Sequence, residues 1–270
     1  MNNTLQKITP QVLQELKESG KKVALLTAHD YPTALIEDRA GIEVILVGDS
    51  LGMTVLGYES TLPVTMDEML IACKAVKRGT RRAMVIADMP YMSYQPSNSL
   101  AIKNAGKFVR EANVDGVKLE GAGPITRRIK SIVEIGIPVM GHIGFTPQSI
   151  KKFGGYKVCG KTDKEMQKLI DDARILEDAG VFCIIAECVS TGVITKLKEA
   201  LRVPIYGIGA GQECDGQILV VNDILGLFPT FLPKYVKRYT NLSPIIERAI
   251  KKYISEVKRG DFPDEAHSYH

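Results

Sequence analysis

Several features are scarce or absent in this sequence of 270 residues, and each absence excludes a class of protein. The five cysteines are odd in number and widely spaced, with no CxxC pair of the kind that binds zinc. No apolar run approaches the roughly 18 residues of a membrane span, and the polar first residues contain no signal-peptide core. We therefore expect a protein of the reducing cytoplasm with no membrane partner.

An excess of one charge is also missing. The 35 basic residues nearly balance the 31 acidic ones, and the basic residues are scattered, so no nucleic-acid partner is predicted. A composition of 45% hydrophobic and 24% charged residues is typical of a globular chain. Without a linker, repeat or low-complexity tract, we predict one domain over residues 1–270, with a short N-terminal helical extension and a C-terminal helix plus tail.

Short apolar runs bounded by Gly, Asp or Pro recur along the whole chain. They cover residues 23–30, 44–49, 83–90, 116–121, 138–144, 181–188, 204–211 and 218–226. Runs that are apolar on both alternating faces are typical of parallel strands covered on each side. We interpret each run as one strand of a parallel sheet.

Helical patterns lie between these runs. Thr65 and Glu68 form a capping-box pattern at the start of a helix that ends at Gly79. Amphipathic helices are also predicted over 163–180 and 243–260. Eight strands alternating with helices favour an α/β fold, a single-domain (β/α)8 TIM barrel, over a doubly wound open sheet. The short segment QECDGQ between the last two runs leaves no room for a crossover helix.

Ionisable residues end most of the runs, where the active site of such a barrel is built. These residues are Asp30, Asp49, Asp88, Lys118, Glu120, His142, Glu187 and Asp223. Because each run is apolar until that point, we expect the charges at the rim of the barrel, outside its packed interior. A single strand-end aspartate most often caps a helix or stabilises a turn, the role we assign to Asp30 and Asp223. Asp49, Asp88 and Glu120 together make an oxygen-rich cluster of the type that holds Mg²⁺.

Three further strand-end residues have two interpretations each. Lys118 shares a strand face with Glu120 and either pairs with the carboxylates or binds an anionic substrate group, of which we favour the second. His142 is either a core histidine or a substrate contact. Glu187 follows four apolar positions and is either a general base, which we favour, or a capping or salt-bridged carboxylate.

A set of longer motifs follows one another in a specific order. These are VGDSLGMTVLGYESTLPVT (47–65), ADMPYMSY (87–94), VKLEG (117–121), GHIGFTPQS (141–149), GGYKVCGKT (154–162), ECV (187–189), GIGAGQECDGQILV (207–220) and EAHSYH (265–270). In these motifs the chain resembles the ketopantoate hydroxymethyltransferase family from end to end. Two positions depart from it: His29 stands where the family frequently has Tyr, and Cys159 where it often has Gln.

The resemblance implies a (β/α)8 barrel assembled into a homodecamer, a pentamer of dimers. It implies Mg²⁺ held by Asp49, Asp88 and Glu120, a 2-oxo acid bound by Asp49, Ser50, Asp88 and Lys118, and Glu187 as proton acceptor. His142 lies in a family motif near the substrate, and we include it among the substrate-binding candidates.

The reaction implied moves a one-carbon unit from 5,10-methylenetetrahydrofolate to C3 of 3-methyl-2-oxobutanoate, through a Mg²⁺-stabilised enolate. The products are 2-dehydropantoate and tetrahydrofolate. Two alternatives stay open. One is a related Mg²⁺-dependent 2-oxo acid C–C lyase of the isocitrate-lyase type, which would need no folate. The other is a non-catalytic ligand-binding barrel.

Overall fold

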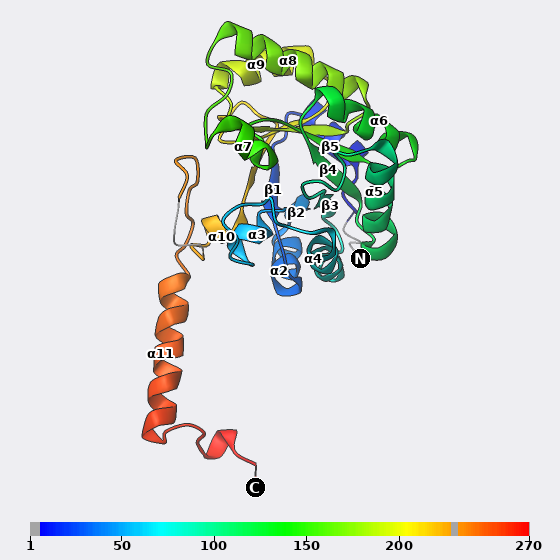
Figure 1. The fold of residues 1–270 in the computed structure, drawn as a ribbon. Coiled ribbons are helices and arrows are strands. Elements are labelled where there is room, and N and C mark those ends of the chain that lie inside the picture. The colour runs from blue at the N-terminus through cyan, green and yellow to red at the C-terminus, as the bar shows by residue number, and fades with distance from the viewer. Residues whose placement is uncertain (1–5, 228–231, 270) are drawn as a thin grey trace. The chain divides into compact units, whose positions relative to one another are not determined.

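The computed structural model describes residues 6–227 and 232–269 of the chain. The chain divides into two compact units, Met1–Val220 and Val221–His270. The first unit contains a closed barrel of eight parallel strands with helices around it (Figure 1). The predicted TIM barrel is confirmed, whereas the single domain over all 270 residues stays a prediction.

The strands follow chain order around the barrel, each hydrogen-bonded to the next and β8 to β1. They are β1 (Val23–Thr27), β2 (Val44–Val47), β3 (Met84–Asp88), β4 (Gly116–Glu120), β5 (Val139–Gly144), β6 (Cys183–Glu187), β7 (Ile205–Ile208) and β8 (Gly216–Leu219).

The helices of the first unit lie mostly between consecutive strands. They are α1 (Pro10–Glu18), α2 (Tyr31–Ala40), α3 (Leu51–Thr54), α4 (Met66–Gly79), α5 (Asn98–Ala112), α6 (Thr126–Glu134), α7 (Ile150–Phe153), α8 (Asp163–Asp178) and α9 (Thr191–Ala200), with single 3₁₀ turns η1 (Gly123–Ile125) and η2 (Pro147–Ser149). Among the described residues, no helix separates β7 from β8, as the short QECDGQ segment predicts.

Two hydrophobic cores result from the alternation of side chains along the strands. On β2, Val44 and Leu46 belong to the core inside the barrel, whereas Ile45 and Val47 belong to the core between strands and helices. Leu13 of α1 joins the inner core. Every position of β2 is therefore buried, which is why the parallel strands read as unbroken apolar runs.

Two predicted helix starts are confirmed. Thr65 and Glu68 form the reciprocal capping box of α4. Asp30 is the N-cap of α2, because its side chain accepts a hydrogen bond from the Thr33 backbone N–H at 2.8 Å. Asp30 therefore has the structural role assigned to it from the sequence.

The predicted eighth strand is largely wrong. The apolar run 218–226 was expected to form it, but β8 covers Gly216–Leu219, and Val221–Ile224 form the short helix α10. Asp223 accordingly lies in the first turn of α10, in the second unit, and ends no strand. That unit also contains the predicted C-terminal helix, α11 (Ser243–Arg259), and the 3₁₀ turn η3 (Glu265–His267). None of the described helices is long and apolar enough for a membrane span.

Candidate active site

Alternate residues of four neighbouring strands bring the ionisable groups onto the inner face of the barrel. On β3, Met84 and Ile86 belong to the inner core and Asp88 continues that face. On β6, Cys183 and Ile185 precede Glu187 in the same way. The strand register sets Asp88 beside Lys118 and Glu120 beside His142. The polar groups therefore form one layer above the apolar interior.

This layer is buried, in contrast to the rim position expected from the sequence. Asp88 is 1% exposed, Lys118 is 4% exposed and Glu187 is 7% exposed. The charged residues do stand toward the ends of the apolar runs, but their side chains are enclosed by the protein. Charges in such an environment interact far more strongly than charges in water.

Asp49 and Ser50 enter the site from the turn after β2. The Asp49 backbone N–H donates a hydrogen bond to Oδ2 of Asp88 at 3.2 Å. The Ser50 Oγ lies 3.5 Å from Nε2 of His29, which follows β1. Burial lowers the pKa of His29 to about 4, so its ring is neutral at physiological pH.

Lys118 is the cation at the centre of the site. Its Nζ lies 2.9 Å from Oδ2 of Asp88 and 3.1 Å from Oε1 of Glu120. Burial alone would lower the pKa of Lys118, but Asp88, Glu120 and Asp49 outweigh it and hold the pKa well above its ordinary value. The pairing of Lys118 with the carboxylates, the less favoured of the two interpretations from the sequence, is therefore present.

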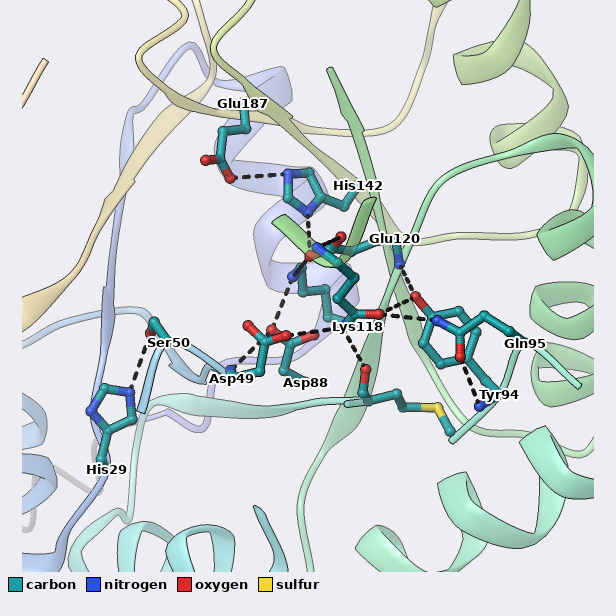
Figure 2. A network of polar contacts seen from close by, with 12 residues as sticks. His29, Asp49, Ser50, Asp88, Tyr94, Gln95, Lys118, Glu120, His142 and Glu187 are labelled. Atoms are coloured by element: carbon teal, nitrogen blue, oxygen red, sulfur yellow. Dashed lines mark hydrogen bonds and ion pairs between the residues drawn. The ribbon is translucent and has the colours of Figure 1, made fainter. Parts of the chain in front are cut away.

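His142 lies between two carboxylates (Figure 2). Its Nε2 is 3.3 Å from Oε2 of Glu187, and its Nδ1 is 3.6 Å from Oε1 of Glu120. Burial and Lys118 lower the pKa of His142, but the two glutamates outweigh them and the pKa is raised. The ring thus links Glu187 to the cluster formed by Lys118 and its partners.

The carboxylates differ in how their charge is neutralised. Burial raises the pKa of Asp49 well above its ordinary value, and the neighbouring Asp88 raises it further. Burial likewise raises the pKa of Asp88, against the opposing effect of Lys118. Burial would also raise the pKa of Glu120, but Lys118 and His142 lower it to about 2. Glu120 is thus the best compensated of the three, because Lys118 and His142 both lie beside it, whereas Asp88 shares Lys118 with Glu120.

The chemistry of the two aspartates fits a divalent cation. Oδ1 of Asp88 is buried and has no hydrogen-bond partner, although its other oxygen has two. In the described part of the chain, no three His, Cys, Asp or Glu side chains converge as a complete metal site. Mg²⁺ usually takes one or two protein carboxylates and completes its shell with water and substrate oxygens, so an incomplete set of this kind suits it.

Sequence reasoning overlooked two residues of the site, Gln148 and Tyr94. Gln148 in η2 donates from Nε2 to Oδ2 of Asp49 at 3.0 Å and accepts from the Tyr94 hydroxyl at 2.8 Å. Both residues stand within motifs quoted above, but neither a charge nor a periodic position singles them out. Their role depends on contacts between segments that are far apart in the sequence.

One glycine is required beside Glu187. Gly144 has φ +92, and a Cβ at this position would lie 2.2 Å from the Glu187 carbonyl oxygen. Only glycine allows β5 and β6 to approach this closely in this conformation. The backbone that carries Glu187 is therefore fixed by its neighbour on β5.

The arrangement can place positive charge and proton-transfer groups around one small anion. Lys118 and a cation at Asp49 and Asp88 would attract a carboxylate and polarise a neighbouring carbonyl. Glu187 reaches the same layer from a different strand and could accept a proton. These capabilities suit proton abstraction beside a carbonyl group.

Comparison with known proteins identifies the family. The sequence model of the ketopantoate hydroxymethyltransferase family matches residues 7–265. The 3-methyl-2-oxobutanoate hydroxymethyltransferase of Carboxydothermus hydrogenoformans is 55% identical, with 98% of this chain and 96% of the relative covered. The enzyme of the same name from Syntrophus aciditrophicus is 52% identical, with 97% of each covered.

Solved structures of distant proteins share the fold. Phosphonopyruvate hydrolase in complex with oxalate and Mg²⁺ superposes with a TM-score of 0.62 at 12% identity, over 97% of this chain and 91% of the other. 2,3-Dimethylmalate lyase, a member of the PEP mutase/isocitrate lyase superfamily, gives 0.59 at 16% identity, over 96% and 91%. At these identities the likeness concerns the fold alone. The sequence relatives are decisive: the chain belongs to the ketopantoate hydroxymethyltransferase family.

Proposed function

We propose that this protein transfers a hydroxymethyl group from 5,10-methylenetetrahydrofolate to C3 of 3-methyl-2-oxobutanoate, giving 2-dehydropantoate and tetrahydrofolate. The observation that carries the proposal is the contact chain in the barrel mouth, in which Glu187, His142, Glu120, Lys118 and Asp88 follow one another at 2.9 to 3.6 Å. This series of contacts joins a proton acceptor to a site for an anionic substrate.

Asp49 and Asp88 would hold Mg²⁺ through the oxygens that face away from their hydrogen-bond donors. Glu120 would be the third residue to hold the ion, and its two oxygens are oriented by Lys118 and by the Gln148 backbone N–H. The bound ion would supply a Lewis acid that stabilises negative charge on the ketone oxygen. Lys118 would add positive charge from its fixed position.

The substrate would be held by Asp49, Ser50, Asp88 and Lys118, all of which reach the same layer. Ser50 has a hydroxyl that can donate to the substrate carboxylate, and the neutral His29 stands 3.5 Å behind it. The ring nitrogens of His142 are directed at Glu120 and Glu187. His142 would therefore meet the substrate with a carbon edge of its ring while it orients the two carboxylates.

Glu187 would remove the proton from C3. The C–H bond electrons would pass to the C2–C3 bond and the carbonyl electrons to the ketone oxygen, which gives an enolate. The nucleophilic C3 would then attack the methylene carbon of the folate as one of its two C–N bonds breaks. A water molecule would replace the second folate nitrogen and supply the hydroxyl group, and tetrahydrofolate would leave with the proton taken from C3 and the proton from water on its two nitrogens. Removing this proton is difficult in water because negative charge accumulates on one oxygen, so positive groups placed at that oxygen lower the barrier.

Location and assembly belong to the same proposal. The five cysteines are free thiols, which suits a reducing cytoplasm. We expect a homodecamer built as a pentamer of dimers, as in the family. Sedimentation velocity of the purified chain tests this, with a single species of ten subunits as the expected result.

One assay tests the proposed reaction directly. Purified protein should form 2-dehydropantoate from 3-methyl-2-oxobutanoate only when 5,10-methylenetetrahydrofolate is supplied, and the rate should fall when EDTA removes Mg²⁺. Product without folate, or cleavage of a C–C bond in a 2-oxo acid, would indicate a lyase instead. No product and no proton exchange would indicate a binding protein.

A further inference from the structure

The side-chain amide of Gln148 uses all of its hydrogen-bonding capacity inside the site. Its Nε2 donates to Oδ2 of Asp49 at 3.0 Å and to the Met89 carbonyl at 2.9 Å. Its Oε1 accepts from the Tyr94 hydroxyl at 2.8 Å and from Nε2 of Gln95 at 3.1 Å. An amide has two donors and two acceptor lone pairs, so none is left over. The buried amide is consequently held in one place.

Tyr94 determines the orientation of the Gln148 amide, that is, which position its oxygen takes and which its nitrogen. Its hydroxyl oxygen accepts a hydrogen bond from the Glu120 backbone N–H at 3.2 Å. The hydroxyl hydrogen is then free to point at Oε1 of Gln148. A reversed amide would set Oε1 against the Asp49 carboxylate and leave the Tyr94 hydroxyl facing an NH₂ group. The hydrogen bonds therefore all run in one direction: the Glu120 N–H donates to Tyr94, Tyr94 donates to Gln148, and Gln148 donates to Asp49.

Gln148 contacts a second carboxylate with its backbone. Its N–H donates to Oε2 of Glu120 at 3.0 Å. One residue thus holds one oxygen of Asp49 with its side chain and one oxygen of Glu120 with its main chain. Asp49 follows β2 and Glu120 ends β4, and these two strands are not neighbours in the barrel.

The hydrogen bonds decide which oxygens remain for a cation. Oδ2 of Asp49 is engaged by Gln148, and Oδ2 of Asp88 is engaged by Lys118 and by the Asp49 backbone N–H. Oδ1 of each aspartate is the oxygen left over, and that of Asp88 is buried without a partner. Partners of this kind, one shell behind a metal, orient the ligands and raise the affinity.

We infer that Gln148, held by Tyr94, is a positioning residue that turns Oδ1 of Asp49 toward the divalent cation. The inference rests on the proposed function, in which Asp49 and Asp88 hold Mg²⁺. It adds two uncharged residues to the machinery, and neither touches the substrate or the metal. Without the amide, the Asp49 carboxylate could rotate and its two oxygens would compete for the ion.

Manganese provides a probe that does not depend on turnover. Mn²⁺ is titrated into the full-length protein and the free ion is measured by electron paramagnetic resonance. We expect Tyr94→Phe and Gln148→Met each to weaken binding by about 10-fold, the usual effect of removing an outer-shell partner. Thermal unfolding of the same samples checks that each variant is folded.

A matched control and a double variant separate positioning from general stability. Tyr206 is another buried tyrosine of the barrel, and its hydroxyl has no hydrogen-bond partner among the described residues. Tyr206→Phe should leave Mn²⁺ affinity unchanged. Since Tyr94 acts through Gln148, the Tyr94→Phe/Gln148→Met double variant should bind about as tightly as Gln148→Met alone.

The other possible results of the Mn²⁺ titrations would contradict either the metal site or the role of Gln148. If the wild-type protein binds no Mn²⁺, the metal site of the proposed function is wrong and the inference fails with it. If the wild type binds but folded Tyr94→Phe and Gln148→Met bind equally well, the inference is overturned while the metal site stands. An equal loss in Tyr206→Phe, or losses that multiply in the double variant, would also overturn it.

Discussion

The backbone N–H of Asp49 donates to Oδ2 of Asp88, which ties the ends of β2 and β3 together and leaves Oδ1 of Asp88 buried without a partner. Asp88→Asn should therefore lower the Mg²⁺-dependent rate by about 100-fold or more, because an amide is a poor ligand for Mg²⁺ and several kcal/mol of charge stabilisation are lost. Initial rates at several Mg²⁺ concentrations measure this change.

Asp30→Asn is the control for that substitution. Asp30 lies between β1 and α2, two strands before Asp88, and its side chain caps α2. Asparagine is as good a cap as aspartate, so the rate and its Mg²⁺ dependence should be unchanged. Full activity in Asp88→Asn would remove Asp88 from the metal site.

The Lys118 ammonium should contribute to stability as well as to catalysis. Lys118→Met leaves Asp88 and Glu120 buried without their shared cation, which should lower the free energy of unfolding by about 3 kcal/mol. Urea denaturation at neutral pH measures the change. Lys168→Met removes a partner of Asp172 on an exposed helix surface and should have no measurable effect. Equal stability of Lys118→Met and wild type would show that the buried pairs are not needed for folding.

Gly144 should be the most sensitive glycine near the site. In Gly144→Ala, the new Cβ would meet the Glu187 carbonyl oxygen at 2.2 Å, so β5 or β6 must move. We expect both a lower melting temperature and loss of activity. Gly154→Ala is the matched control, since Gly154 also has positive φ, +71, but has nothing within 4 Å of an added Cβ. It should lose only about 1 kcal/mol of stability from backbone strain and keep its activity. Similar behaviour of the two variants would contradict the close-approach argument.

Glu37 of α2 should make stability depend on pH. Burial raises its pKa from an ordinary 4.5 to about 8, and neither carboxyl oxygen has a hydrogen-bond partner among the described residues. The folded protein keeps this proton between pH 4.5 and about 8, whereas the unfolded chain releases it. Stability should therefore fall as pH rises through this window, at up to about 1.4 kcal/mol per pH unit.

Glu37→Gln removes the ionisation and should flatten this pH dependence. Melting temperatures of both proteins at pH 5, 6, 7 and 8 measure the effect, since the variant's advantage should grow steadily with pH. A constant difference between the two across the range would mean that Glu37 titrates normally in the folded state.

The barrel could be predicted because its strands are buried on both faces. On β2 and β3 every residue is buried, so an apolar run marks the strand directly. The bounds of β8 could not be predicted in this way, because Gln217 is exposed and Gly216 is a residue typical of turns. A Cβ at Gly216 would lie 2.2 Å from the Val23 carbonyl oxygen, so glycine is needed there for the contact with β1.

The sequence predicted only those residues of the candidate site that are charged and lie at the end of a strand. Asp49, Asp88, Lys118, Glu120 and Glu187 each follow an apolar run, and the structure brings them into one buried layer. Gln148 and Tyr94 carry no charge. Gln148 contacts Asp49 across 99 residues of sequence and Tyr94 across 54. No local pattern encodes such contacts, because they arise only when the barrel closes.

The central claim is that Glu187 removes a proton from C3 of the substrate, and hydrogen–deuterium exchange tests it most directly. 3-Methyl-2-oxobutanoate is incubated in D₂O with protein and Mg²⁺ but without folate, and the C3 proton signal is followed by NMR. We expect rapid exchange with the wild type and with Glu199→Gln, which alters an exposed glutamate of α9. Glu187→Gln should slow exchange by about 100-fold or more. Undiminished exchange in a folded Glu187→Gln protein would contradict the assignment of Glu187 as the base.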